Sequence, residues 1–567
     1  MLEEVLTNLR PSERLLLYIL AAMLGISILI LLVAVNREAT VVVPSRGGSI
    51  TEGMVGSVRF INPILAVSQT DNDLTELVFS GLTKTLADGT TAPNLAASYD
   101  ISEDGKIYTF ILRDNITFHD GEPVTAPDVV FTVRMAQHPD VKSPRRPDWE
   151  GVSVTSQDEK TIVFSLQNAY APFLENTTLG ILPEHVWKNV LPEEFPFSPR
   201  NTNPVGSGAF RFKSAKTDRT GAVTELRLAS FPDYALGVPH LRRLTFRFYQ
   251  NEETLLAAHN AEAIDMFVGI APEKINTRRN NLIELRTTLP RVFGVFFNQN
   301  HLALLADPSV RAALDASVDK DALIRDVLGG FGTPLSGPIP PGILTEEPER
   351  EAEERGSDAE EIEKAWIETS HAILKKGGWS LDEESGIWHK KTTPLAFTLA
   401  TSDAPELVKT AEYIAERWRQ IGADVSVHVY TLSELNNTVI RPRAYDALLF
   451  GEVVGKTLDL FAFWHSSQRN DPGLNLALYA NTRADSLLQE ARETVDKKKR
   501  EELYNIFRDI VQKDTPAVFL YAPQFMYVIP TYVHGVELGV VSTPKDRFAE
   551  VHTWYVDTER VWNIFAP

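Results

Sequence analysis

An uninterrupted apolar run close to the N-terminus constrains this chain more than any other feature. Residues 15 to 35, LLLYILAAMLGISILILLVAV, contain no charged side chain. At about 1.5 Å per residue, a helix of this length spans roughly 30 Å, the thickness of the hydrocarbon core of a bilayer. A cleavable signal peptide usually has a shorter apolar region, of about 7–15 residues, with small residues after it, whereas Arg37 and Glu38 follow this run. We therefore predict an uncleaved transmembrane anchor, Leu15–Val35.

The charges on either side of the anchor do not settle its orientation. Arg10 and Arg14 precede it, and Arg37 and Arg46 follow it, so the count of positive residues is nearly balanced. A short N-terminal tail precedes the span and a large acidic body follows it. We predict that residues 1–14 are cytoplasmic and that the body faces the periplasm or the cell exterior, as a single-pass protein of the cell membrane.

Composition narrows the class of the body. The chain has 567 residues, more than one core usually organises, so two or more lobes are expected. The net charge of −20 argues against nucleic acid as a partner, because no basic stripe is present to neutralise phosphates. The absence of cysteine excludes disulfides, thiolate metal sites and a lipidated N-terminal cysteine. Residues 36–47 are expected to be a tether, with the body starting at residue 48.

The stretch SEDGKIYTFILRDNITFHDGEPVTAPDVVF, residues 102 to 131, combines strand, turn and helix signals. Asp-Gly pairs predict turns, and the apolar residues 106–113 lie on both faces of an extended segment, which predicts a buried strand. Thr125 and Asp128 have the spacing of a helix capping box. His119 and Asp120 are adjacent, so in an extended segment their side chains point to opposite faces. They are therefore predicted to be scaffolding and not a catalytic pair.

Three later segments indicate further organisation. Residues 307–330 predict two consecutive helices. Residues 345–364 are strongly acidic, which predicts a solvated surface insertion. Residues 394–450 predict a β-α-β unit that continues into another strand, and hence a parallel strand pair. Ligands in such sheets bind beyond the carboxyl ends of the strands, where Thr401-Ser402 and Gly451-Glu452 stand.

Motifs for catalysis, metals and cofactors are lacking. The sequence contains no H-E-x-x-H, no G-x-S-x-G elbow and no P-loop. The segment PVGSGAFRF, 204–212, could form a nest of backbone N–H groups for an anion, but a tight turn into a strand is favoured. We predict no enzyme activity, no metal site and no cofactor. Aromatic and polar residues near predicted strand ends (RFINP, VFSGL and FAFWHS) suit an apolar pocket with a few orienting hydrogen-bond partners.

Ordered motifs along the body resemble one family. These are VGSVRFINPILA (55–66), the block 78–132 that begins VFSGLTKTLADGTTAPNLAASYDISEDGKIYTF, LGILPEHVW (179–187), NPVGSGAFRF (203–212), FFNQN with the tract 307–342, and 487–521. The chain from about residue 48 to residue 556 resembles the extracytoplasmic solute-binding proteins of family 5, the dipeptide- and oligopeptide-binding class of peptide/nickel-type ABC importers.

The resemblance implies an α/β, bilobal, periplasmic-binding-protein-like fold (type II, cluster C-like), to which an N-terminal transmembrane helix is added. Lobe I would comprise 48–288 and 525–567, and lobe II would comprise 289–524. Two strands would cross between the lobes, near 289–297 and 518–525, and hinge motion would close the lobes on a solute.

Peptide-binding members usually place an aspartate, which holds the peptide's N-terminal ammonium, in a loop that here falls near Val454 or Gly455. Glu452 or Asp459 could substitute, or the ligand lacks a free amine, because a buried ammonium without a counter-charge is costly. The residues expected to bind ligand, on the first and then the second wall, are Arg59, Phe60, Asn62, Phe79, Ser80, Glu452, Asp459, Phe461 and Trp464.

The resemblance thus predicts a membrane-anchored, extracytoplasmic receptor that binds peptides between its lobes and delivers them to the permease subunits of an ABC importer. Two alternatives stay open. The same fold could bind a non-peptide solute, such as a metal chelate or an oligosaccharide. It could also serve as a sensory or chaperone protein without a permease.

Overall fold

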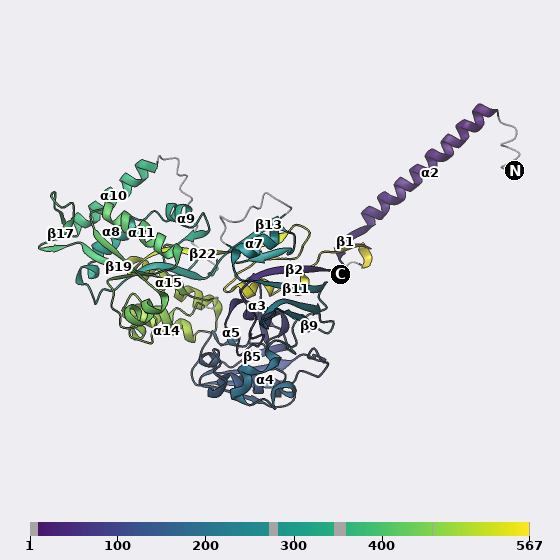
Figure 1. The fold of residues 1–567 in the computed structure, drawn as a ribbon, viewed down its shortest axis with the longest axis horizontal. Coiled ribbons are helices and arrows are strands. Elements are labelled where there is room, and N and C mark those ends of the chain that lie inside the picture. Colours follow the sequence, from purple (N-terminus) through teal and green to yellow (C-terminus); the bar gives the residue numbers. More distant parts are fainter. Residues whose placement is uncertain (1–9, 271–281, 345–358, 456–457, 566–567) are drawn as a thin grey trace.

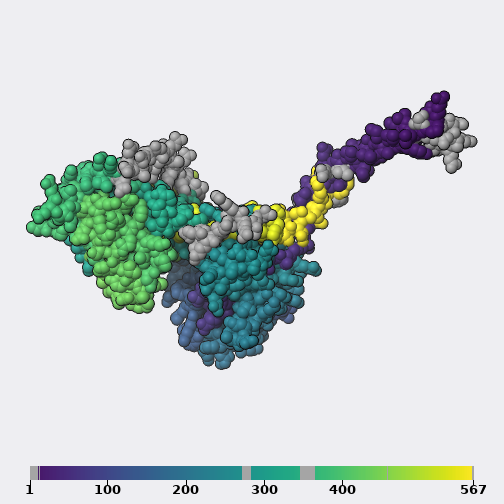
Figure 2. Space-filling model, turned by 45° about the horizontal axis from the view of Figure 1, so that its top comes forward, coloured from purple at the N-terminus to yellow at the C-terminus, as the bar shows by residue number. Residues whose placement is uncertain are grey.

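A computed structural model describes residues 10–270, 282–344, 359–455 and 458–565. The body has two parts that lie side by side, and helix α2 (Pro11–Ala39) projects away from both (Figure 1). We use "first lobe" for the elements from β2 to β13 with the segment after β22, and "second lobe" for the elements from β14 to α15. Figure 2 shows the two lobes as separate masses with a notch between them on one side.

One sheet runs through both lobes. Among the described residues it has 12 strands, with the order β20-β19-β21-β14-β22-β12-β2-β11-β10-β9, and β13 and β15 also pair with β22. Its strands are β2 (Gly47–Val55), β9 (Phe210–Thr217), β10 (Val223–Ser230), β11 (Leu241–Tyr249), β12 (Met266–Val268), β13 (Leu282–Thr288), β14 (Arg291–Phe297), β15 (Gly332–Pro334), β19 (Ala396–Ser402), β20 (Asp424–Tyr430), β21 (Ala447–Val453) and β22 (Ala517–Pro530).

Strand β22 joins the lobes. Its first half pairs with β14 through Ala517–Tyr521, and its second half pairs with β13 through Gln524–Pro530. The hydrophobic cores divide along the same strand: Phe525 and Tyr527 belong to the core of the first lobe, and Val518 and Tyr521 belong to a core of the second. Because the cores are separate while the strand is continuous, β22 and the β13–β14 connection are the links between the lobes.

The first lobe also carries a four-stranded antiparallel sheet, β5 (Ala96–Ile101), β6 (Ile107–Leu112), β8 (Thr161–Leu166) and β7 (Val152–Ser156), with helix α4 (Ala126–Gln137). Thr125 and Asp128 form the expected capping box of α4. The predicted burial of both faces of β6 is wrong: Ile107 and Ile111 are 45% and 47% exposed, because only the face with Tyr108, Phe110 and Leu112 meets the core.

His119 and Asp120 point to different partners, as predicted. His119 Nε2 lies 3.0 Å from the Gly208 carbonyl oxygen, and burial lowers the pKa of His119 to about 4. Asp120 Oδ2 lies 2.9 Å from His185 Nε2. The segment 204–212 leads into β9 as predicted, and Gly208 N donates to Val78 O at 2.8 Å, a contact with a distant part of the chain in place of a local turn.

The second lobe contains the expected β-α-β unit. β19 pairs in parallel with both β20 and β21, and helix α11 (Pro405–Gln420) crosses from β19 to β20. Helices α8 (Pro308–Ala316) and α9 (Lys320–Val327) begin at the caps Asp307 and Asp319. The predicted acidic insertion lies outside the described residues at 345–358, and its last residues enter α10 (Ala359–Lys376).

The segment expected to be a tether is ordered. Helix α2 continues to Ala39, and residues 40–44 form strand β1 (Thr40–Pro44), which pairs with the C-terminal strand β23 (Thr558–Trp562). The apolar window of α2, Leu15–Asn36, has no residue buried against the described body. The remaining elements are α3 (Gln69–Val78), β3 (Thr83–Thr85), β4 (Thr91–Pro93), α5 (Phe173–Asn176), α6 (Glu184–Trp187), α7 (Glu252–Asn260), β16 (Ser380–Leu381), β17 (Trp388–Lys390), β18 (Thr393–Pro394), α12 (Leu432–Glu434), α13 (Phe461–Trp464), α14 (Thr482–Glu493), α15 (Lys497–Asp514) and short 3-10 turns.

Candidate ligand-binding cleft

A cavity of about 430 Å³ lies where the crossing strands leave the first lobe. Helix α3 supplies one side of it, and Ser68 caps the start of this helix by accepting a hydrogen bond from Asp71 N. The crossing strands supply the opposite side, and the segment after β22 completes the wall. The residues around it include Gln69, Asn72, Arg145, Leu289, Arg291, Gln524, Phe525, Thr543 and Lys545.

A second cavity, of about 360 Å³, adjoins the first. The two share Asn72, Arg145, Thr543 and Lys545, so they form one continuous surface along α3. Phe79 and Tyr170 line the far part of the second cavity. Together the cavities have the size of small-molecule sites in proteins.

Charged side chains of both signs line this surface, and the positive ones differ in how they are neutralised. Lys545 Nζ lies 3.0 Å from Glu76 Oε2, and Arg145 Nη1 lies 3.8 Å from Asp148 Oδ2. Arg291 is half-buried, its Nε makes no hydrogen bond, and its guanidinium has no ion pair among the described residues. Burial lowers the pKa of Arg291, and no neighbouring carboxylate opposes that effect. Within the described part of this wall, Arg291 is therefore a positive charge without a carboxylate partner.

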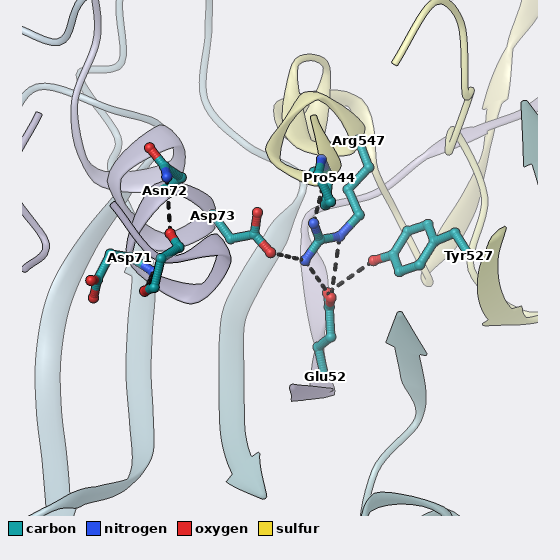
Figure 3. Close-up of polar contacts among 8 residues, drawn as sticks. Glu52, Asp71, Asn72, Asp73, Tyr527, Pro544 and Arg547 are labelled. Carbon is teal, nitrogen blue, oxygen red and sulfur yellow. Dashed lines mark hydrogen bonds and ion pairs between the residues drawn. The ribbon is translucent and has the colours of Figure 1, made fainter. Parts of the chain in front are cut away.

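A buried ion cluster holds α3 in place (Figure 3). The guanidinium of Arg547, from the 3-10 helix η9 (Pro544–Phe548), lies between two carboxylates: its Nη2 is 2.7 Å from Glu52 Oε1 and 2.8 Å from Asp73 Oδ2. The Tyr527 hydroxyl donates to Glu52 Oε2 at 2.9 Å. Burial raises the pKa of Asp73 to about 6 although Arg547 opposes the rise. The cluster ties α3 to β2, β22 and η9, and so fixes the backbone beneath the cavities.

The lobes also touch away from the crossing strands. Asp459 Oδ2 of the second lobe accepts hydrogen bonds from the Tyr170 hydroxyl at 3.2 Å and from Arg492 Nη2 at 2.8 Å. Ala171 N donates to Arg492 O at 2.9 Å. A third cavity, of about 270 Å³, lies beside this contact and is lined from both lobes, by Tyr99, Ala171, Leu174, Leu344, Leu458, Val495 and Tyr504 among others. The binding surface is thus bounded by the crossing strands at one end and by this contact at the other.

Sequence comparison identifies the family. The model of the bacterial extracellular solute-binding proteins, family 5, matches residues 90–482. The chain belongs to this family. This chain is 26% identical to the oligopeptide-binding protein AppA of Bacillus subtilis over 526 residues. The alignment covers 90% of this chain and 92% of AppA.

Structural comparison agrees with the family. The structure of AppA from Bacillus subtilis in complex with a nonapeptide matches 91% of this chain and all of its own length, with a TM-score of 0.65 and 26% identity. The chain is also 23% identical over 446 residues to the nickel-binding protein NikA of Staphylococcus aureus, covering 77% of this chain and 82% of that one. The predicted family and the bilobal α/β fold are confirmed.

The ligand-binding residues predicted for the wall of the first lobe fall into two groups. Phe79 lines the second cavity, and Arg59 is exposed beside Phe60, with its guanidinium carbon 4.8 Å from the ring centre. Asn62 and Ser80 are buried and bind protein: Asn62 Nδ2 donates to Asn201 Oδ1 at 3.0 Å, and Ser80 Oγ donates to Ser207 O at 3.2 Å. Asn62 and Ser80 therefore hold neighbouring segments of the first lobe together and do not line the cavities.

The residues predicted for the second wall also separate. Asp459 and Phe461 lie at the contact between the lobes, where Arg492 stacks over the Phe461 ring at 4.6 Å. Glu452 and Trp464 are buried inside the second lobe, and this corrects their expected place on the cleft surface. The cause is strand register: Glu452 pairs with Val292, a residue buried in the core on the same side of the sheet as Trp464.

Sequence reasoning missed the charged residues of the wall. Arg291 stands inside LPRVFGVFF, the segment predicted to cross between the lobes, and a lone arginine in an apolar crossing strand was a usable signal. Lys545 and Arg547 gave no such signal, because they follow β22 and reach α3 only through the folded C-terminal segment.

Proposed function

We propose that this chain is the substrate-binding receptor of an ABC importer, that it binds peptides between its two lobes, and that it delivers them to permease subunits. Membership of family 5 and the likeness to AppA, solved with a nonapeptide, support this reading. The single observation that carries it is the cavity of about 430 Å³ at the crossing strands, because opening or closing of the lobes about these strands would change access to it.

Arg291 is the group proposed to bind the solute. A half-buried guanidinium with no carboxylate partner among the described residues has already lost part of its hydration. A carboxylate is the partner that a guanidinium binds best, through two parallel N–H···O bonds. The free C-terminus of a peptide would supply it.

The structure offers no carboxylate for a solute amine at the position that usually carries one. Val454 is buried, and Gly455 has a left-handed backbone with φ of +68°. Glu452 is enclosed in the second lobe. Asp459 is already bound by Arg492 and Tyr170. We therefore propose that recognition rests on the anionic end of the solute more than on its amine.

The test measures the melting temperature of the full chain in detergent against tripeptides to nonapeptides, each with a free or an amidated C-terminus. A ligand at about 100 times its dissociation constant adds about 2.7 kcal/mol to stability. We expect shifts with free peptides that shrink on amidation and in Arg291→Gln, and that Arg291→Lys partly restores. Arg325→Gln, on an exposed face of α9, is the matched control. A library without any shift would overturn peptide binding, and equal shifts for both forms would overturn the role of Arg291.

A metal chelate is the second candidate, because NikA of Staphylococcus aureus is a nickel-binding relative and because the carboxylates of a chelating ligand would suit Arg291 equally well. Titration with nickel in the presence and absence of free histidine separates the two. A shift with the chelate but with no peptide would replace the peptide assignment. The prediction that the chain is not an enzyme is tested by chromatography of a peptide after long incubation with it, and a cleaved peptide would contradict that prediction.

We also propose that α2 anchors the chain in the cell membrane with the body outside. The span is long and apolar enough, and the helix runs directly into β1, which belongs to the folded body. Intact mass of the mature protein from its source distinguishes anchor from signal: a mass that begins before Leu15 supports the anchor, and a mass that begins near Thr40 overturns it.

A further inference from the structure

The C-terminal strand returns to the end of helix α2. β1 and β23 pair antiparallel from Thr40 opposite Trp562 to Pro44 opposite Thr558. Beyond the pairing, Asn563 Nδ2 donates to Glu38 O at 3.3 Å, on the last turn of the helix. The C-terminal segment therefore meets the end of α2 where the helix leaves the body, and the N-terminus lies at the far end of α2 (Figure 1).

Large apolar side chains are exposed at that point. Trp562 is 52% exposed and Ile564 is 82% exposed. Trp562 is the last residue of β23 and Ile564 follows two residues later, so the strand pairing sets where this segment lies relative to α2. Burial of Trp562 and Ile564 in an apolar or amphipathic environment would be favourable, because it would remove their apolar surface from water.

The height of these side chains matches the edge of a bilayer. Glu38 lies three residues beyond Val35, about 4.5 Å along the axis at 1.5 Å per residue. The headgroup layer is roughly 5–8 Å deep on each side of a hydrocarbon core of about 30 Å. If the apolar window Leu15–Asn36 fills the core, Trp562 and Ile564 fall within the headgroup layer, where tryptophan is enriched in membrane proteins.

We propose that the C-terminal segment 562–564 is a second membrane contact, in which Trp562 and Ile564 enter the lipid headgroup region next to α2. This inference rests on the proposed anchoring by α2. Two points of attachment, joined by the β1–β23 pair, set the first lobe at a fixed height and tilt on the membrane, whereas a single helix on a flexible tether would let the body turn freely.

The experiment uses the full chain in nanodiscs of phosphatidylcholine and phosphatidylglycerol. The chain has nine tryptophans, of which eight lie between residues 149 and 554 and none lies in α2. Phospholipid brominated on the acyl chain near the headgroup quenches nearby indoles. We expect the wild type to lose the share of emission that belongs to one tryptophan, and Trp562→Phe to lose none. Equal quenching in both proteins, or none in either, would overturn the contact.

A separate label distinguishes failure of this contact from failure of the anchor. Because the chain has no cysteine, single-cysteine variants carry a spin label at one site only. Gly25→Cys, in the middle of α2, should be accessible to oxygen and protected from a water-soluble nickel reagent, while Phe197→Cys, exposed on the first lobe, should show the reverse. A protected Gly25→Cys with an unquenched Trp562 overturns the second contact alone. An unprotected Gly25→Cys overturns the anchor and the contact together.

Discussion

Each lobe buries acidic side chains, and the two lobes differ in whether these side chains have a charged partner. In the first lobe, Glu52 and Asp73 share the guanidinium of Arg547, and Tyr527 adds a hydrogen bond to Glu52. In the second lobe, Glu452 is equally buried, and neither of its oxygens has a hydrogen bond within the described part of the chain. Burial raises the pKa of Glu452 well above its ordinary value, and the nearby Trp464 indole opposes this only in part, without reaching hydrogen-bonding geometry.

The difference shows that a buried acidic side chain can take part in a charged cluster when a cationic side chain lies beside it, and that burial alone does not decide this. Burial alone would lower the pKa of Arg547, but Asp73 and Glu52 raise it above its ordinary value. The first lobe thus keeps a charged cluster that links four separate segments. The second lobe keeps a carboxyl group whose pKa is raised by burial, because a lone buried carboxylate would cost several kcal/mol.

Removal of Arg547 should have the largest effect. Arg547→Met leaves two buried carboxylates without a counter-charge, and we expect the free energy of unfolding to fall by about 3–5 kcal/mol. Urea unfolding of the full chain in detergent measures it. Arg325→Met, on an exposed face of α9, is the control and should change stability by less than about 0.5 kcal/mol. A loss below about 1 kcal/mol for Arg547→Met would mean that the cluster contributes no more than a surface ion pair.

Removal of one hydroxyl from the same cluster should cost less. Tyr527→Phe keeps the ring in the core and removes the hydrogen bond to Glu52 Oε2. Hydrogen bonds to charged groups contribute about 1.5–3 kcal/mol, and we expect a loss in that range by the same measurement. Tyr532→Phe removes an exposed hydroxyl, which donates to Asp265, and it should change stability much less. An equal loss in the two variants would show that burial of the cluster does not strengthen this bond.

The raised pKa of Glu452 should show in how stability depends on pH. The pKa of Glu452 is higher in the folded chain than in the unfolded chain. The folded state therefore holds the proton more tightly, and the contribution to stability is complete below about pH 4.5 and is lost as pH rises through the folded pKa. Glu452→Gln does not titrate. We expect its stability to rise relative to wild type by roughly 1.4 kcal/mol per pH unit across that window. Parallel pH profiles would show that Glu452 is ionised in both states.

The smallest expected effect concerns solute binding. Because Glu452 lies inside the second lobe, Glu452→Gln should leave the dissociation constant of any bound peptide unchanged at a pH where both proteins are folded. Isothermal titration measures it, with Arg291→Gln as the variant expected to weaken binding. A loss of affinity confined to peptides with a free amine would return Glu452 to the role of ammonium partner.

Local sequence patterns determined much of the fold. Caps at Thr125, Asp307 and Asp319, the β-α-β unit after residue 394, and the apolar helix depend on side chains a few residues apart along the chain. The separation of His119 from Asp120 follows from the geometry of an extended segment. Such features depend on short-range contacts that any folded arrangement keeps. The family motifs added the two-lobed arrangement.

The tertiary structure alone decided which polar residues face the cleft. Glu452 and Trp464 stand among cleft-like motifs, but strand pairing turns them into the core of the second lobe. The cluster at Arg547 joins residues 495 positions apart in the chain, and β23 meets β1 from the opposite end of the sequence. The physical reason is that the charge state and exposure of a side chain depend on neighbours brought by strand register and long-range pairing, which the order of the amino acids does not display.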